Sequence, residues 1–579
     1  MGEFVDLIAG ANRLRSVAAA VLAAALLSVP MASTTVVVPS ADGGSGESAR
    51  YIVRATSAGL SGLGEHVTLL GGALEQELTG LGAALVTVPV AAVDTLRQLD
   101  GVLGVTKDAR LQLHGSTYTA STDSGSMYNV AQVTNAKKMW GNGVTGRGVD
   151  VALIDSGVAP VAGLTAPGKV VNGPDISFES QNPDTRYLDT FGHGTFMAGV
   201  IAGSDGTFSS SAYTGMAPGS RVISLKVADA YGNTDVSQVI AAIDWVVQHR
   251  KDPGMNIRVL NLSFGTPSMQ SYVLDPLSYA AEVAWRKGIV VVVSAGNDGT
   301  GTGKLLNPAQ NPFVLAVGAE DSRGTPAIGD DTIPDFSTRG DGIRNPDVVA
   351  PGASIQGLRV PGSYVDVTYG ATAAFEDRYF KGSGTSQAAA VVSGAAALLL
   401  EHRPGLTPDQ VKALLTRGAR PLPAANLQAQ GNGLIDVYAA SQAAAPLTAQ
   451  TFVRSTGTGT LDAARGGVRL VLDGVTLSGE KDIFGKTYVS STRALEEAAE
   501  TSWQGGLWNG SSWAGSSWAG SSWAGSSWAG SSWAGSSWAG SSWATGVWNG
   551  SSWAGSSWAG SSWAGSSWAG SAWATGGWR

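Results

Sequence analysis

One of the five histidines lies in a sequence context suited to catalysis. His193 stands in the stretch Asp189-Thr-Phe-Gly-His-Gly-Thr-Phe-Met-Ala-Gly199, where small residues allow a helix to begin beside the imidazole. A neutral imidazole is the side chain most often used as a general base near neutral pH. We therefore expect His193 to transfer protons, and we expect the other histidines to be ordinary surface residues.

A catalytic imidazole works together with a carboxylate and a hydroxyl, and the sequence offers a candidate for each. Asp155 ends the apolar run that begins at Val151, so we expect its carboxylate at the carboxyl end of a buried strand, where open α/β sheets place functional groups. Ser386 opens an Ala-rich helix, and a helix N-terminus favours the negative charge that grows on a carbonyl oxygen under attack. The chain contains no cysteine, which excludes a thiol nucleophile.

A fourth group is the amide of Asn297, which follows the apolar run Val291-Val-Val-Ser-Ala-Gly. At the end of a strand this amide is suited to donate a hydrogen bond to the oxyanion of a tetrahedral intermediate. The four groups together predict acyl transfer through a covalent intermediate.

The three motifs resemble those of the subtilisin family of serine peptidases. They occur in the order Asp, His, Ser, which differs from the order in chymotrypsin and in the α/β-hydrolases. Three similar segments, 215–219, 261–265 and 346–352, extend the resemblance over nearly all of residues 128–440. The sequence departs from the common family pattern at Gln387, where Met usually follows the nucleophile, and at Phe196, where a second His is common.

The resemblance implies a role for each of these residues. Ser386 would be the nucleophile, His193 the general base and acid, and Asp155 the group that orients the imidazole. Asn297 would stabilise the oxyanion. A further family segment pairs its backbone with an extended substrate peptide. In this chain that segment is Ser263, Phe264 and Gly265.

Apolar runs alternate with helix-length segments between residues 128 and 445. Such runs are typical of strands in a mainly parallel sheet that helices cover on both faces. We therefore expect an α/β catalytic domain of the subtilisin type, with three layers, over residues 128–445. The runs lie at 149–154, 222–227, 258–262 and 288–294.

Three segments precede this domain. Residues 1–38 have the arginines and the Ala- and Leu-rich stretch of an export signal, and an uncleaved membrane anchor is the alternative. Residues 49–113 predict a small α+β module, which the family resemblance identifies as an inhibitory propeptide. Residues 114–127 lack apolar periodicity and predict an exposed linker that a protease can cut. The chain is therefore expected to be a secreted precursor that processes itself.

An extension over residues 446–500 leads into a repeat over residues 503–579. Tryptophan occupies every fifth position from Trp503 to Trp578 and accounts for 16 of the 19 tryptophans. So many indoles expose too much apolar surface to be without consequence in water. We consider a packed coil of repeats, a strip that binds cell-wall glycan through its indoles, and an unstructured stalk. A surface protein whose main role lies in this repeat is the alternative to a peptidase.

Composition excludes some classes of partner. The net charge is −8 and the sequence has no basic cluster, so nucleic acid is not expected to bind. No cofactor is expected, because the Gly-rich stretch 141–146 precedes its strand instead of following one. Structural calcium is conceivable at acidic pairs such as Asp330-Asp331, but the spacing identifies no site.

Overall fold

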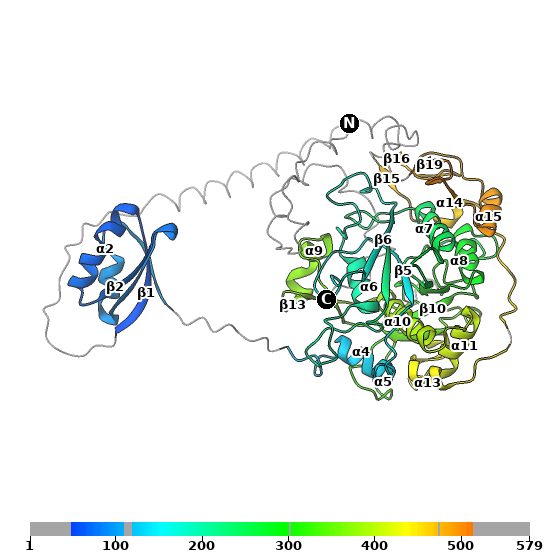
Figure 1. Ribbon diagram of the computed structural model, residues 1–579, viewed down its shortest axis with the longest axis horizontal. Coiled ribbons are helices and arrows are strands. Elements are labelled where there is room, and N and C mark those ends of the chain that lie inside the picture. The colour runs from blue at the N-terminus through cyan, green and yellow to red at the C-terminus, as the bar shows by residue number, and fades with distance from the viewer. Residues whose placement is uncertain (1–47, 109–117, 300–302, 448, 473–474, 513–579) are drawn as a thin grey trace, which may run out of the picture. The chain divides into compact units, whose positions relative to one another are not determined.

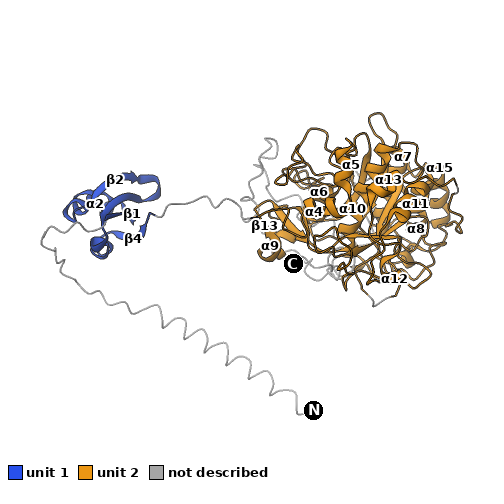
Figure 2. Ribbon diagram, turned by 90° about the horizontal axis from the view of Figure 1, so that it is seen from below, with its two compact units in different colours: residues 1–115 blue, residues 116–579 orange. Residues whose placement is uncertain are grey.

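The computed structural model describes residues 48–108, 118–299, 303–447, 449–472 and 475–512. The chain divides into two compact units, residues 1–115 and residues 116–579 (Figure 2). The predicted export signal and the repeat beyond residue 512 lie outside the described residues. Within the described residues, no helix combines the length and the apolar character that crossing a membrane requires.

Unit 1 contains a four-stranded antiparallel sheet with the order β2-β3-β1-β4. Alternate residues of the strands are buried, as Val86 and Val88 are in β3, and they pack with Leu63 and Val67 of the first helix. The order of elements along the chain is β-α-β-β-α-β. The elements are β1 (Ser48–Ala55), α2 (Ser57–Leu69), β2 (Ala73–Leu78), β3 (Ala83–Pro89), α3 (Val93–Arg97) and β4 (Val102–Lys107).

Unit 2 is built on a seven-stranded parallel sheet with the order β11-β10-β9-β8-β5-β7-β6 (Figure 1). The central strands are buried along their whole length, as expected for a sheet covered on both faces. The sheet therefore confirms the predicted fold class. Its strands are β5 (Asp150–Asp155), β6 (Val170–Asp175), β7 (Arg221–Lys226), β8 (Ile257–Leu262), β9 (Val290–Ser294), β10 (Leu315–Glu320) and β11 (Val348–Pro351).

Helices cover this sheet in two layers. Helices α6 (His193–Ala202) and α10 (Thr385–His402) pack against each other and against the sheet, and α7 (Val236–His249) and α8 (Pro276–Arg286) form a second packed pair. The remaining helices are α4 (Met127–Val133), α5 (Ala136–Gly141), α9 (Tyr364–Ala373), α11 (Pro408–Gly418), α12 (Leu427–Gln430), α13 (Val437–Gln442), α14 (Leu461–Ala464) and α15 (Ser490–Ala499). Three antiparallel strands, β12 (Ile355–Leu358), β13 (Ala374–Phe375) and β14 (Tyr379–Gly382), form a small separate sheet.

The strand order reverses at β5. The chain passes from β5 to β6 and β7 on one side, and then to β8 and β9 on the other. Open α/β sheets bind ligands at the carboxyl ends of the strands beside such a reversal. Asp155 is the last residue of β5, so the fold places it where a functional site is expected.

The exposed linker is shorter than the sequence predicted. Residues 118–126 form turns that belong to unit 2 instead of spanning freely to it. Asp123 forms an ion pair with Lys381 at 2.7 Å, and the carbonyl of Gly125 accepts a hydrogen bond from the backbone of Gln356 at 2.8 Å. Composition predicted an exposed linker over these residues because small polar residues are common in linkers. Such residues also form tight turns against a folded surface.

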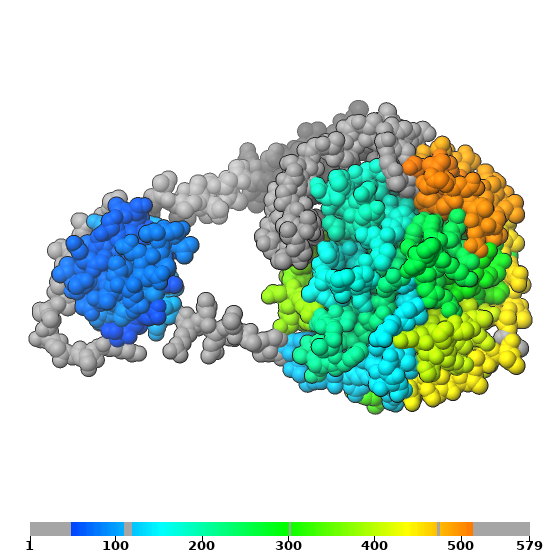
Figure 3. All heavy atoms as spheres, viewed as in Figure 1, coloured from blue at the N-terminus to red at the C-terminus, as the bar shows by residue number. Residues whose placement is uncertain are grey.

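The segment after residue 446 shares the hydrophobic core of unit 2. Arg465 is fully buried and pairs with Asp235, the N-cap of α7, at 2.7 Å. Glu500 pairs with Arg250 and with Lys287, each at 2.6 Å. In the space-filling view this segment, in orange, lies against the green surface of α7 and α8 (Figure 3). We call residues 446–512 the C-terminal clamp.

The first two tryptophans of the repeat belong to this clamp. Strands β17 (Trp503–Gln504), β18 (Leu507–Trp508) and β19 (Ser511–Ser512) form an antiparallel meander. Its turns, Gly505-Gly506 and Asn509-Gly510, have positive φ at both central residues, which suits two-residue hairpins. Trp508 is fully buried and its Nε1–H donates to Asp244 at 2.8 Å, while the Nε1–H of Trp503 donates to the carbonyl of Ala241, also at 2.8 Å.

Asp244 makes the stability of the protein depend on pH. Burial raises the pKa of Asp244 to about 7, and the hydrogen bond from Trp508 offsets only part of this effect. The folded protein therefore retains this proton to a higher pH than the unfolded chain does. The contribution of Asp244 to the free energy of unfolding consequently falls as the pH rises from about 4 to about 7.

We predict that Asp244→Asn flattens this pH dependence, because an amide still accepts from Trp508 but does not ionise. Thermal unfolding midpoints measured from pH 4 to pH 7 check this. The midpoint of the variant should rise relative to that of the wild type as the pH increases. Parallel curves for the two proteins would contradict the prediction.

Candidate active site

Asp155 and His193 form a buried pair. The Nδ1 atom of His193 lies 2.7 Å from Oδ1 of Asp155, and each side chain is only 1% exposed. His193 is the first residue of α6, which follows Gly192 in a left-handed conformation with φ of 106°. A side chain at position 192 would be strained, so glycine allows this helix to begin with the imidazole against Asp155. The structure thus brings together two of the predicted site residues.

Two opposing effects act on the Asp155 carboxyl. Burial raises the pKa of Asp155 above its usual value, and the charge interaction and hydrogen bond with His193 offset only part of this effect. Its Oδ1 also accepts a hydrogen bond from the backbone N–H of Ser156 at 2.8 Å. An ionised carboxylate in this place fixes the ring orientation and the position of the imidazole proton.

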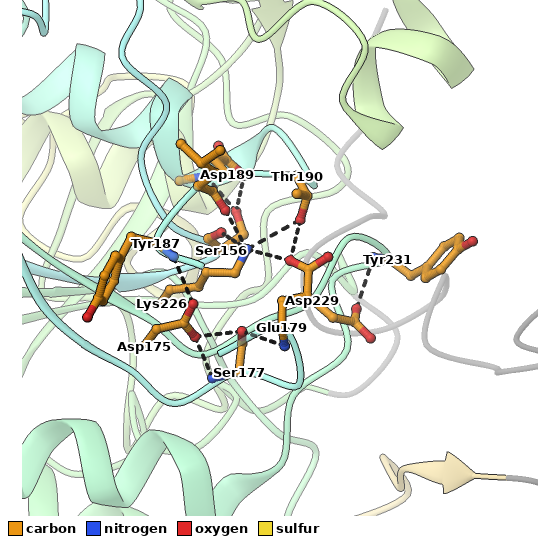
Figure 4. Close-up of polar contacts among 12 residues, drawn as sticks. Ser156, Asp175, Ser177, Glu179, Tyr187, Asp189, Thr190, Lys226, Asp229 and Tyr231 are labelled. Atoms are coloured by element: carbon orange, nitrogen blue, oxygen red, sulfur yellow. Dashed lines mark hydrogen bonds and ion pairs between the residues drawn. The ribbon is translucent and has the colours of Figure 1, made fainter. Parts of the chain in front are cut away.

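Asp189 connects the strand that carries Asp155 to the helix that carries His193 (Figure 4). Its carboxylate accepts from the hydroxyl of Ser156 at 2.8 Å, from the backbone N–H of Gly192 at 2.6 Å and from that of Thr195 at 2.7 Å. These bonds satisfy backbone donors that the first turn of α6 leaves open. Asp189 therefore fixes the residues beside both partners of the buried pair, through Ser156 on one side and the first turn of α6 on the other.

Lys226 and Glu179 form a second buried link beside this pair (Figure 4). Lys226 ends β7 and lies opposite Asp155 in the parallel ladder. Its Nζ lies 2.7 Å from Glu179 and donates to the carbonyl of Ser156 at 3.1 Å. Burial by itself lowers the pKa of Lys226, but Glu179 and Asp175 outweigh it and hold this pKa above its usual value. A charged ammonium thus anchors the turn directly after Asp155.

Sequence reasoning missed Lys226 and Glu179. A lysine within the mainly apolar run 222–227 is a usable signal, because a buried lysine requires a partner. Nothing local in the sequence identifies Glu179 as that partner, since 47 positions separate the two residues.

Ser386 lies in the first turn of α10, which packs against α6. The residue is 4% exposed, and its Oγ lies 3.5 Å from the carbonyl oxygen of Ser263. Helix α10 is buried along nearly all of its length. The nucleophile predicted from the sequence is therefore held at the N-terminus of a rigid helix, next to the predicted substrate segment.

Asn297 is hydrogen-bonded to Thr385, the first residue of α10. Its Oδ1 accepts from the backbone N–H of Thr385 at 2.9 Å and from the Thr385 hydroxyl at 3.0 Å. Because these bonds use the amide oxygen, the Nδ2 donors point elsewhere. Nδ2 lies 3.3 Å from the position that a Cβ would occupy on Gly384, which places it beside the residues that precede Ser386.

The segment Ser263-Phe264-Gly265 directly follows β8 and is buried. The Ser263 hydroxyl donates to the carbonyl of Ser386 at 3.4 Å, so the segment borders the start of α10. All seven predicted site residues thus lie at or near the carboxyl ends of β5, β8 and β9, or at the first turns of α6 and α10.

Among the described residues, no group of three or more His, Cys, Asp or Glu side chains is placed to hold a metal ion. Asp331, from the acidic pair noted above, lies close to Glu320. Burial raises the pKa of Asp331 to about 6 and the pKa of Glu320 well above its usual value. This pair of carboxyls does not by itself identify a calcium site, and structural calcium stays an expectation from the sequence.

Comparison with known proteins identifies the family of the chain. A model of the subtilase family matches residues 146–433, and a model of peptidase inhibitor domains matches residues 26–108. Subtilisin E of Bacillus subtilis (strain 168) is 32% identical over 375 residues, which cover 64% of this chain and 84% of that protein. The chain therefore belongs to the subtilase family, as its motifs predicted, and its first unit is an inhibitor-type propeptide domain.

Two other relatives extend this comparison. Serine protease AprX of Bacillus subtilis (strain 168) is 38% identical over 295 residues, which cover 50% of this chain. This chain spans 65% of the length of AprX. Fervidolysin from Fervidobacterium pennivorans is a similar solved structure, with 23% identity and a TM-score of 0.45, over 69% of this chain and 62% of that one.

Proposed function

We propose that the chain is a serine endopeptidase, made as an exported precursor, that hydrolyses peptide bonds through an acyl-enzyme on Ser386. One observation carries this proposal: the hydrogen bond of 2.7 Å between the buried side chains of Asp155 and His193. A buried carboxylate that fixes an imidazole at a helix start is the arrangement of a general base. Ser386 supplies the nucleophile on the helix that packs against α6.

The reaction proceeds in two steps. His193 takes the proton of the Ser386 hydroxyl as Oγ bonds to the peptide carbonyl carbon, and the imidazolium then gives this proton to the leaving amine as the C–N bond breaks. Water, deprotonated by His193, attacks the acyl-enzyme and returns Ser386 to its free form. In both steps the oxyanion accepts hydrogen bonds from Asn297 Nδ2 and from the open backbone donors at the start of α10.

The substrate is proposed to be an extended peptide that pairs with the backbone of residues 263–265. Such pairing requires a free strand edge, so unfolded or loop segments bind and folded cores do not. Unit 1 is proposed to inhibit the enzyme until it is removed. Residues 118–126 are held on unit 2 by hydrogen bonds and an ion pair. We therefore propose that the processing cut lies between residues 108 and 118. Binding of cell-wall glycan by the repeat stays a prediction.

Expression of the precursor beside a Ser386→Ala variant tests the proposal. The wild type should cut itself, hydrolyse casein and react with an active-site phosphonate, whereas the variant should stay full-length with casein hydrolysis reduced by about 10⁴-fold or more. Ser383→Ala, three residues away, is the matched control and should behave as the wild type. Equal self-cleavage by the wild type and Ser386→Ala would defeat the proposal.

Asn297→Ala is expected to lower kcat by about 10²- to 10³-fold with little change in KM, because its amide donates to the oxyanion only when that charge forms. The same substitution also removes the acceptor for Thr385. Thr385→Val, which loses the hydroxyl bonds to Asn297 and to the backbone N–H of Gly296 but keeps the Asn297 amide, controls for that structural role and should retain most activity. Similar losses in both variants would assign Asn297 a structural role instead.

A further inference from the structure

Two chain segments flank the predicted nucleophile. Residues 263–265 follow β8, and residues 295–297 follow β9, its neighbour in the parallel sheet. The first borders Ser386 through the carbonyl of Ser263, at 3.5 Å from Oγ. The second borders the same helix start through the bond from Thr385 to Asn297, at 2.9 Å. A peptide carbonyl that reaches both Ser386 and Asn297 must therefore lie over the gap between these segments.

Leu306 occupies this gap. Its backbone N–H donates to the carbonyl of Ala295 at 3.1 Å, and its neighbour Asn307 exchanges two backbone hydrogen bonds of 2.9 Å with Thr266. Its chain thus bridges the two segments. A Cβ added to Gly265 would lie 2.8 Å from Leu306 Cβ, and one added to Gly296 would lie 2.8 Å from Leu306 Cγ. The side chain therefore fills the space that these two glycines leave open.

Leu306 differs in this respect from its neighbour Leu305. Leu305 is 1% exposed and belongs to the main hydrophobic core of unit 2. Leu306 is only 5% exposed, yet it is not among the residues of the hydrophobic clusters in the described chain. This buried isobutyl group, which borders the backbone of Gly265 and Gly296, limits the space beside the nucleophile.

An extended peptide presents its side chains alternately to opposite faces. The residue that supplies the scissile carbonyl has its Cα one bond away from the attacked carbon. When the backbone of this residue pairs with residues 263–265, its side chain faces either solvent or the gap that Leu306 fills. A large side chain directed into the gap meets Leu306, whereas hydrogen or methyl fits above it.

We infer that Leu306 makes this peptidase selective for a small residue, such as Gly, Ala or Ser, immediately before the scissile bond. The inference rests on the proposed function and specifies its substrate. The contacts of Leu306 with Gly265 and Gly296 carry it. Leu306 is accordingly a specificity-determining residue.

The test uses the mature enzyme and two chromogenic peptides that differ only in having Ala or Phe before the scissile bond. The wild type should give a kcat/KM at least about 10-fold higher for the Ala peptide, since pocket size discriminates by about 10- to 200-fold per group. Leu306→Ala should raise kcat/KM for the Phe peptide and remove or invert this preference. Leu305→Ala, the matched control, removes the same atoms from the core and should leave the ratio unchanged.

The outcomes separate this inference from the proposed function. Hydrolysis of both peptides with equal kcat/KM, or an unchanged ratio in Leu306→Ala, would overturn the role of Leu306 and leave the peptidase proposal intact. Failure of the wild type to hydrolyse either peptide or to react with the phosphonate would overturn both. If Leu306→Ala does not fold, the inference is tested by identifying the sites at which the wild type cleaves casein. Small residues before the cut support the inference, and large ones overturn it.

Discussion

Replacement of Asp155 by Asn is expected to lower kcat by about 10⁴-fold while KM and the unfolding midpoint stay close to those of the wild type. The carboxylate accepts the Nδ1 proton of His193 at 2.7 Å, which makes Nε2 the nitrogen that takes a proton from Ser386. An amide in the same place donates to Nδ1 and favours the tautomer with its proton on Nε2. That tautomer cannot deprotonate Ser386. The variant also lacks the charge that stabilises the imidazolium.

Steady-state kinetics on a peptide substrate measure this effect. Asp189→Asn is the control, because Asp189 belongs to the same network and accepts hydrogen bonds from Ser156, Gly192 and Thr195. Its loss of kcat should be closer to about 10²-fold, as expected for a displaced but correctly protonated base. An Asp155→Asn variant that keeps more than a tenth of wild-type kcat would remove Asp155 from the mechanism.

The site residues were predictable because each one is marked by its immediate neighbours. Asp155 follows an apolar strand, His193 and Ser386 open helices after glycine, and Asn297 follows another strand. Because these neighbours are adjacent in the chain, a single sequence is sufficient to identify each site residue. The parallel sheet was predictable for the same kind of reason, since strands buried on both faces are apolar throughout.

The groups that hold the site together were less predictable. The pair of Lys226 with Glu179 and the pair of Arg465 with Asp235 join positions 47 and 230 residues apart. Which charged residues form ion pairs depends on which surfaces the fold brings together. Periodicity in the sequence does not predict these pairs. Trp508 was missed for a related reason: within a uniform repeat nothing distinguishes this indole, which the meander buries against α7, from the others.

Removal of the C-terminal clamp is expected to abolish stable folding of the catalytic unit, although the predicted site residues all precede it. A chain ending at residue 445 loses the buried ion pair of Arg465 with Asp235, and loss of one partner of such a pair costs up to about 3 to 5 kcal/mol. It also loses Trp508, whose removal from a core costs about 3 to 5 kcal/mol. Together these losses approach the whole stability of a typical domain, about 5 to 15 kcal/mol.

A series of truncations in the Ser386→Ala background, which avoids self-digestion, separates the clamp from the repeat. A chain ending at Ser512 keeps the meander and should unfold at the same denaturant concentration as the full chain. A chain ending at Thr501 loses Trp508 and should unfold at a clearly lower concentration, and a chain ending at Ala445 should show no cooperative transition. If the chain ending at Ala445 unfolds like the full chain, the buried contacts of Arg465 and Trp508 do not stabilise the catalytic unit. Stability would then reside in the sheet and in α6 and α10 alone.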